Sequence, residues 1–179
     1  MPGDVALDLS RKGELPTDLL FADNILKLKP YELYEWWYQR DFPTPQGITG
    51  RRLELRFHGA DCLATYWLNG RELGESSDAM VEQHFDVTGR LNGAGASVLT
   101  VRLRSPIVEA TIERYDPAYT IAARKTNQEA IWIRRPAHSY AWDIMPRAVS
   151  AGLWRPVELI AHPRARPPQR CGLASRSEP

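Results

Sequence analysis

The sequence predicts an all-β fold, an antiparallel β-sandwich with short helical insertions. Strand-like segments recur about every ten residues and are separated by turns rich in Gly, Asn and Pro. One of them, Arg51–Phe57, alternates cleanly between apolar and charged residues. Another ends at Asn69-Gly70, the dipeptide that best supplies the two positive φ values of a type I′ hairpin turn. Helical patterns do not alternate with the strands, so a parallel βαβ layout is not expected.

The clearest strand is Arg51–Phe57, because its side chains should point alternately to the core and to solvent. We expect Leu53, Leu55 and Phe57 to face inward and Arg52, Glu54 and Arg56 to face outward. Period-two patterns or β-rich composition predict the other strands, at residues 36–42, 62–68, 71–74, 81–87, 97–103 and 154–160.

Two helical segments are expected beside the strands. Asp4 can cap a helix of two turns that ends at Gly13, and residues 106–116 have apolar side chains spaced by three and four. The residues between Gly13 and Leu33 show no period and are expected to be irregular. Five tryptophans in strands or beside turns are expected to be core residues, because each indole buries a large area. They are Trp36, Trp37, Trp67, Trp132 and Trp154.

Composition and charge exclude several classes of function. The chain has 179 residues, enough for one core, and 23 Lys and Arg against 22 Asp and Glu give a net charge of +1. This balance lacks the basic surface of a nucleic-acid or anionic-membrane binder, and no apolar run approaches the roughly 20 residues that span a bilayer. Cys62 and Cys171 are not expected to form a disulfide, and the N-terminus shows no export signal. These features leave the compartment open and favour the cytoplasm.

Common catalytic and cofactor motifs are absent from the sequence. Phosphate-binding glycine loops, zinc-protease and hydrolase signatures and paired C-x-x-C motifs do not occur. The histidines at 58, 84, 138 and 162 have no ligand spacing, so neither a metal nor a cofactor is expected. Residues 117–150 instead interleave aromatic and basic side chains without a clear period, which is typical of loops that carry sites. Arg134, Arg135 and Arg147 in this segment could line a site, form scaffold ion pairs or belong to a docking face.

Three segments carry a family resemblance. The first combines residues 2–13 with Glu35–Phe42, similar to an opening helix and a "W-x-Y-x-x-x-F" strand. The second, residues 55–88, is similar to "L-x-F-x-G-x-D … V-x-L-N-G-x-x-L-G … F-D-V-T". The third, residues 133–157, is similar to "R-K-x-x-x-x-x-G-W-D-W-G-P-R … G-I-W-R-x-V". In this order they resemble the N-terminal sugar-binding domain of glycoside hydrolase family 2, and the third resembles its β-mannosidase branch.

The resemblance implies a jelly-roll-like, galactose-binding-domain-like sandwich at the start of a larger enzyme. Such enzymes hydrolyse β-glycosides with retention, using two Glu residues on a separate barrel of roughly 250 residues. We therefore expect a domain over residues 1–161 that lacks its first strand, a linker or tail over 162–179, and no catalytic residue in this chain. The expected partners are a β-linked sugar and the barrel of the same larger protein.

The resemblance also implies a substrate-binding role for Trp142 and Asp143. In the β-mannosidase branch, the matching Trp-Asp pair reaches toward the barrel pocket and helps to hold the sugar that is cleaved off. Ala141, Ile144 and Met145 depart from the family pattern, which leaves mannoside specificity open. Two alternatives remain: a stand-alone carbohydrate-binding module and a purely structural sandwich.

Overall fold

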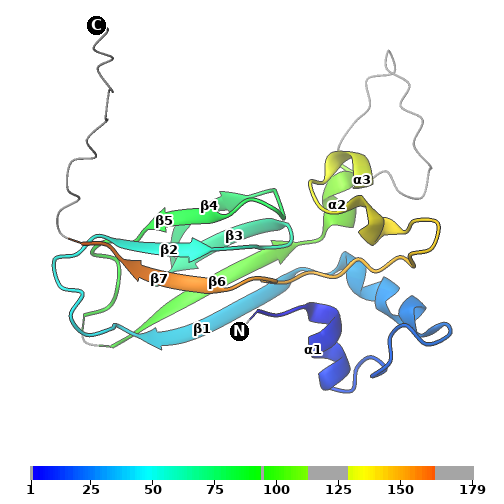
Figure 1. Cartoon of the computed structure of the whole chain (residues 1–179), viewed down its shortest axis with the longest axis horizontal. Helices are drawn as coiled ribbons and strands as arrows, with labels where there is room; N and C mark the ends of the chain where they lie inside the picture. The colour runs from blue at the N-terminus through cyan, green and yellow to red at the C-terminus, as the bar shows by residue number, and fades with distance from the viewer. Residues whose placement is uncertain (1, 94, 113–128, 164–179) are drawn as a thin grey trace, which may run out of the picture.

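Two antiparallel sheets face each other in the computed structural model, which describes residues 2–93, 95–112 and 129–163 (Figure 1). One sheet has the order β1-β6-β3-β4 and the other the order β5-β2-β7. The strands are β1 (Trp36–Pro43), β2 (Leu53–Phe57), β3 (Leu63–Leu68), β4 (Arg71–Ser76), β5 (Gln83–Asp86), β6 (Ala96–Arg104) and β7 (Val157–Ala161). The predicted all-β sandwich is confirmed.

The short helical segments gather at one end of the sandwich, on the right in Figure 1. They are α1 (Val5–Arg11), η1 (Asn24–Leu33), α2 (Pro106–Ala110), α3 (Glu129–Trp132) and η2 (Ala137–Tyr140). The opposite end consists of the turns that join the strands. The two ends of the sandwich therefore differ in secondary structure.

The core between the sheets contains the inward side chains of β2 and β3. Leu53, Leu55 and Phe57 are buried, as the alternation predicts. The ring of Phe57 lies 4.4 Å from that of Tyr66, and the Tyr66 hydroxyl forms a 2.8 Å hydrogen bond with the Ser76 hydroxyl. Burial of these rings stabilises the face-to-face packing of the two sheets.

The Asn69-Gly70 turn is confirmed between β3 and β4. Both residues have positive φ, 52° and 75°, as a type I′ turn requires. The Asn69 side chain also accepts a hydrogen bond from the Val98 amide and donates one to the Arg90 carbonyl, each at 2.8 Å. These hydrogen bonds connect the hairpin to β6 and to the segment that precedes it.

The N-terminal helix is confirmed, and a close approach of two backbones holds it in place. The Asp4 carboxylate accepts a hydrogen bond from the Leu7 amide, and Gly13 has φ of +80°. The segment 3–5 lies beside the segment 151–153, with its Gly3 and Val5 amides each donating a hydrogen bond of 2.8 Å. A Cβ at Gly152 would overlap the Gly3 backbone. Glycine is therefore required at the first position of the "G-I-W-R-x-V" pattern.

Several element boundaries differ from the expectations. The stretch expected to be irregular contains η1, whose ten residues include Pro30. Helix α2 ends at Ala110 rather than at residue 116, and residues 113–128 lie outside the described part of the chain. β7 begins after Pro156, because proline has no amide hydrogen for the ladder.

The expectation that five tryptophans are core residues is wrong. Trp36 and Trp132 are partly buried and pack at the margins of apolar clusters. Trp154 lies against Gly59 and donates a hydrogen bond to the Ala79 carbonyl, but more than a third of it is exposed. The other two, Trp37 and Trp67, stack on the outer face of the four-stranded sheet. Their strand positions are as predicted, but they point outward.

Cys62 is buried and free, and Cys171 lies outside the described residues. Burial raises the pKa of the Cys62 thiol to about 12. The thiol therefore stays protonated at neutral pH, which makes it a poor nucleophile.

Glu54 departs from the expected pattern because it points outward and is nevertheless buried, with only 8% of its surface exposed. Its carboxylate accepts hydrogen bonds from His84, Arg56 and His162 at 2.9 to 3.1 Å. On the same outer face, His58 contacts Glu82 and Glu158. His84, Arg56 and His162 cover Glu54, and alternation alone does not reveal such a cover.

The stability of the domain should depend on the ionisation of Glu54 in acid. The hydrogen bond from His84, followed by those from Arg56 and His162, lowers the pKa of Glu54 from 4.5 to about 2, although burial opposes this. A carboxylate with a lowered pKa stabilises the fold above its unfolded value, and this contribution is lost as the pH falls toward 2. In urea unfolding from pH 2 to pH 5, Glu54→Gln should flatten the rise in stability, whereas the exposed control Glu14→Gln should not. Equal slopes in both variants would contradict this role for Glu54.

Candidate functional site

The predicted site residues lie on a tight turn at the helical end. Residue 141, where the family pattern has glycine, is an alanine with φ of +91°. Immediately after it, the Trp142 amide donates to the Met145 carbonyl at 3.0 Å, and the Met145 amide donates back to the Trp142 carbonyl at 3.2 Å. The backbone thus keeps a conformation that favours glycine, although the residue has changed.

Trp142 and Asp143 are both exposed at the tip of this turn. Trp142 has 73% of its surface accessible, and Asp143, Ile144 and Met145 are exposed as well. The hydrogen bond from the Ala148 amide to the Ser139 carbonyl, 3.0 Å, closes the loop at its base. The structure therefore brings Trp142 and Asp143 together on one projecting turn.

Tyr140 forms the base of the loop and is fully buried. The guanidinium groups of Arg135 and Arg147 lie over its ring, 5.5 and 5.8 Å from the centroid. Burial raises the pKa of the Tyr140 hydroxyl, despite the opposing charge of Arg135. The residue at the base of the loop is therefore an uncharged aromatic ring that contacts two cations.

Arg147 connects the loop to two helical segments. Its Nε and Nη2 donate to the Glu32 carboxylate of η1 at 2.7 to 3.1 Å, and its Nη1 donates to Glu129 of α3 at 2.6 Å. Burial opposes the charge of Arg147, but the hydrogen bonds to Glu32 and Glu129 raise its pKa above the usual value. Both glutamates are nearly buried, so this cluster fixes the loop base firmly.

The other two arginines of the segment also form ion pairs. Arg135 contacts Asp61 at 2.8 Å and donates to the Ser150 carbonyl, and Arg134 contacts Asp78 at 3.1 Å. Burial raises the pKa of Asp61, and the charge of Arg135 opposes that shift. Arg134, Arg135 and Arg147 were expected to line a site, to form scaffold ion pairs or to belong to a docking face. Their contacts are those of scaffold ion pairs. Sequence reasoning missed their partners, because no local spacing links Glu32 or Asp61 to this segment.

Exposed apolar side chains accompany the loop at the helical end. They come from the segment between α1 and β1, which lies beside the other helical segments in Figure 1. The members that are more than half exposed are Leu20, Phe21, Leu26, Leu33 and Tyr34. Five such side chains within one segment make it a candidate for a contact with another domain or protein.

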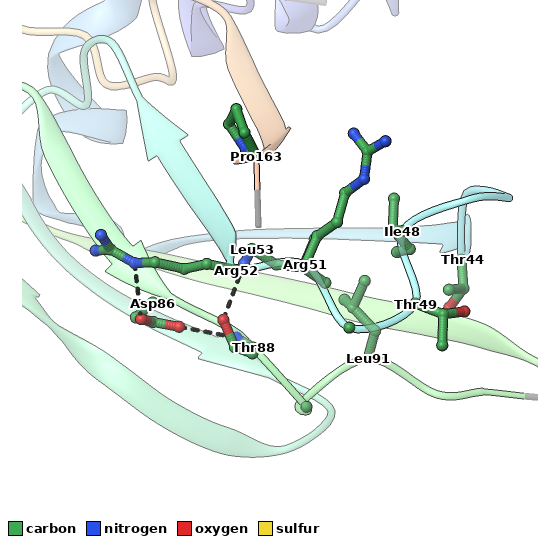
Figure 2. Close-up of a pocket in the computed structure, with 12 residues that line it drawn as sticks. Thr44, Ile48, Thr49, Arg51, Arg52, Leu53, Asp86, Thr88, Leu91 and Pro163 are labelled. Atoms are coloured by element: carbon green, nitrogen blue, oxygen red, sulfur yellow. Dashed lines mark hydrogen bonds and ion pairs between the residues drawn. The ribbon is translucent and has the colours of Figure 1, made fainter. Parts of the chain in front are cut away.

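An open depression of about 710 Å³ lies at the opposite end, between the turn after β1 and the segment after β5 (Figure 2). Its polar groups bind one another: Arg52 pairs with Asp86 at 3.2 Å, and the Thr88 hydroxyl accepts from the Leu53 amide at 2.9 Å. Hydrogen bonds from Thr88 and then the contact with Arg52 lower the pKa of Asp86. Neither Trp142 nor Asp143 lines this depression. It is therefore distinct from the predicted site.

The histidines at 58, 84 and 162 are brought together on the outer face of the three-stranded sheet, while His138 lies in η2. Among the described residues, no group of three or more His, Cys, Asp or Glu side chains could hold a metal ion. In the same part of the chain, no helix is long and apolar enough to cross a membrane.

Comparison with known families agrees with this architecture. Residues 1–155 match the model of the glycosyl hydrolase 2 galactose-binding domain-like family. The chain belongs to this family. The match includes the helical end and every described strand except β7, which begins at Val157.

Relatives of this galactose-binding-like domain include β-mannosidases. Beta-mannosidase B of Neosartorya fischeri is 26% identical over 160 residues, and that of Thermothelomyces thermophilus is 26% identical over 158 residues. The crystal structure of the β-D-mannosidase of Dictyoglomus thermophilum superposes with a TM-score of 0.79 and 28% identity. The match covers 89% of this chain and 19% of the Dictyoglomus enzyme. The shares are similar in the two fungal proteins, so the domain corresponds to a minor part of each relative.

Proposed function

We propose that this domain is an accessory part of a retaining family 2 glycoside hydrolase of β-mannosidase type, and that Trp142 and Asp143 form one lip of its sugar pocket. The observation that carries the proposal is the projecting Trp-Asp turn on a buried, ion-paired base. A rigid base matters because a substrate-positioning group must be held in place before the sugar binds. The similarity to β-mannosidases supports the class of sugar.

The chemistry of the two side chains suits a sugar. An indole face packs against the apolar C–H face of a pyranose, and a carboxylate accepts charge-assisted hydrogen bonds from sugar hydroxyls. Trp142 would act as the platform and Asp143 as the hydroxyl acceptor. The two carboxylates that perform retaining hydrolysis would come from the catalytic barrel of the larger protein.

The exposed apolar side chains of the helical end would form the contact with that barrel. This places the docking surface beside the turn, so that Trp142 and Asp143 could reach over the edge of the barrel pocket. In this proposal residues 1–161 form the accessory domain and residues 162–179 serve as a linker or tail.

The native mass tests whether a catalytic domain belongs to the same protein. An antiserum against the 179-residue chain should detect a band several-fold larger than 20.3 kDa in extracts of the source cells. A band near 20 kDa would contradict a covalently attached barrel.

Asp143→Ala in that larger protein should lower kcat/KM for an aryl β-mannoside by about 10- to 100-fold, the effect of losing one or two charge-assisted hydrogen bonds. The melting temperature should stay unchanged, because Asp143 is exposed. Asp41→Ala, an exposed carboxylate on β1, serves as the matched control and should leave kcat/KM unaltered. A fall in stability without a fall in kcat/KM would favour a purely structural sandwich.

A further inference from the structure

Two tryptophans meet on the outer face of the four-stranded sheet, although their strands are not neighbours. Trp37 on β1 lies opposite Arg102 on β6, and Trp67 on β3 lies opposite Thr100 of the same strand. The two indoles extend over β6 and stack, with centroids 5.5 Å apart and planes inclined by 20°. They therefore form an aromatic pair that spans three strands, with one face of each ring packed against the other.

Polar side chains that are linked by hydrogen bonds lie next to the two indoles. The Arg102 guanidinium carbon lies 5.7 and 5.8 Å from the rings of Trp37 and Trp67. Arg102 donates to the Thr65 hydroxyl at 3.4 Å, and that hydroxyl donates to the Glu75 carboxylate at 2.9 Å. The indoles thus lie beside a cation, a hydroxyl and a carboxylate that hold one another in position.

The exposure of Trp37 is not explained by the packing of the domain. It is 58% exposed, whereas an indole in a sandwich is normally covered. The neighbouring outward residues are polar: Gln39 and Asp41 continue along β1, and Glu72 lies opposite Trp67 on β4. The apolar surface is therefore confined to the two rings and has a polar rim.

The size of this surface identifies the class of ligand. A stable protein interface buries about 800 Å² on each partner around an apolar centre, which two indoles with a polar rim do not supply. A pyranose has one apolar C–H face of about the area of an indole, surrounded by hydroxyls that both donate and accept hydrogen bonds. β1 is an edge strand of its sheet, and Gln39 and Asp41, which follow Trp37 on the same face, are exposed, so a glycan stacked on Trp37 has room to extend along β1.

We propose that Trp37 and Trp67, with Arg102 and Glu75, form a carbohydrate-binding surface for internal sugars of a polysaccharide, separate from the Trp142-Asp143 turn; that the polysaccharide is β-linked rests on the function proposed above. Trp37 supplies the stacking face, and Glu75 and Arg102 accept from and donate to the sugar hydroxyls. The surface would hold a polymeric substrate near the enzyme without taking part in hydrolysis.

Titration of the 179-residue chain with β-1,4-linked mannohexaose and, separately, cellohexaose tests the surface. Binding is followed by NMR of the indole Nε1–H signals, up to about 10 mM sugar, which detects millimolar Kd values. At least one hexaose should shift the Trp37 and Trp67 signals. Absence of a shift with both hexaoses would overturn the proposal.

Two variants separate the sheet surface from the turn. Trp37→Ala should weaken binding at least about tenfold, because one stacking face is lost, and Trp142→Ala should bind as the unaltered chain does. Loss of binding in Trp142→Ala alone would place the sugar on the turn and overturn the proposal. This titration does not depend on the kinetic result for Asp143→Ala. The proposed roles of the sheet surface and of the turn are therefore tested separately.

Folding and self-association are controlled in the same samples. Trp37→Ala should have the same melting temperature as the unaltered chain, because Trp37 is exposed. Glu75→Gln keeps the shape of the side chain and should weaken binding severalfold. If neither Trp37→Ala nor Glu75→Gln changes the affinity for the hexaoses, the proposal is overturned. Sedimentation should give the monomer mass for all samples, and self-association that Trp37→Ala abolishes would identify the surface as a protein contact instead.

Discussion

Replacing Arg147 with methionine should destabilise the domain by about 3 to 5 kcal/mol, the usual cost of removing one partner from a buried ion pair. The reason is that Glu32 and Glu129, which are 6% and 10% exposed, would lose the cation that both contact. For a domain of this size the melting temperature should fall by roughly 10 °C. Urea unfolding, monitored by circular dichroism, measures the effect.

Two further variants make this result specific. Arg11→Met removes the cation of the exposed pair with Asp8 and should change stability by less than about 1 kcal/mol. Neutralising both glutamates in the Arg147→Met background, with Glu32→Gln and Glu129→Gln, should recover much of the loss, because no buried charge is then left unpaired. A loss below about 1 kcal/mol in Arg147→Met would show that the cluster does not hold the loop.

Replacing Gly152 with alanine should destabilise the domain by about 3 kcal/mol, at the upper end for overpacking. The new Cβ would overlap the Gly3 carbonyl oxygen, and a backbone cannot yield as the end of a flexible side chain can. Relief requires the segment 3–5 to move away and to lose its hydrogen bonds to Leu153 and Ala151. Hydrogen exchange at the Gly3 and Val5 amides should therefore accelerate in the variant.

Gly93→Ala is the matched control for this prediction. A Cβ at Gly93 meets no atom within 4 Å, so stability should stay within about 0.5 kcal/mol of the unaltered chain. If Gly152→Ala is as mild as Gly93→Ala, the close approach of the two backbones does not constrain α1.

The elements that depend on local sequence were predictable. The alternation of β2 and the Asn69-Gly70 turn depend on neighbouring residues, and both occur where the patterns indicate. A period of two also assigns each residue to a face of its sheet. It does not show what covers that face, which is why Glu54 is buried on the outside and Trp37 remains exposed.

The candidate site was predictable only in part. The resemblance to family 2 drew attention to Trp142 and Asp143, and the exposed turn is consistent with that prediction. The support beneath the turn was not predictable, because Arg147 and Glu32 are 115 residues apart and only the fold brings them together. The same holds for the two tryptophans that meet across β6, since pairing of β1 and β3 through a third strand leaves no spacing in the sequence.

The contacts that join the first and last parts of the domain have a consequence for its biosynthesis. Helix α1 is synthesised before the strands of this domain, but the Ala6 amide donates to the hydroxyl of Ser150, which is 144 residues later in the chain. The amides of Gly3 and Val5 likewise find their acceptors only when residues 151–153 have been made. Chains emerge from the N-terminus first, and contacts distant in sequence form late. These backbone contacts of α1 should therefore form only after residues 150–153 have been translated, although Ala6 can pack earlier against Leu15 and Leu28.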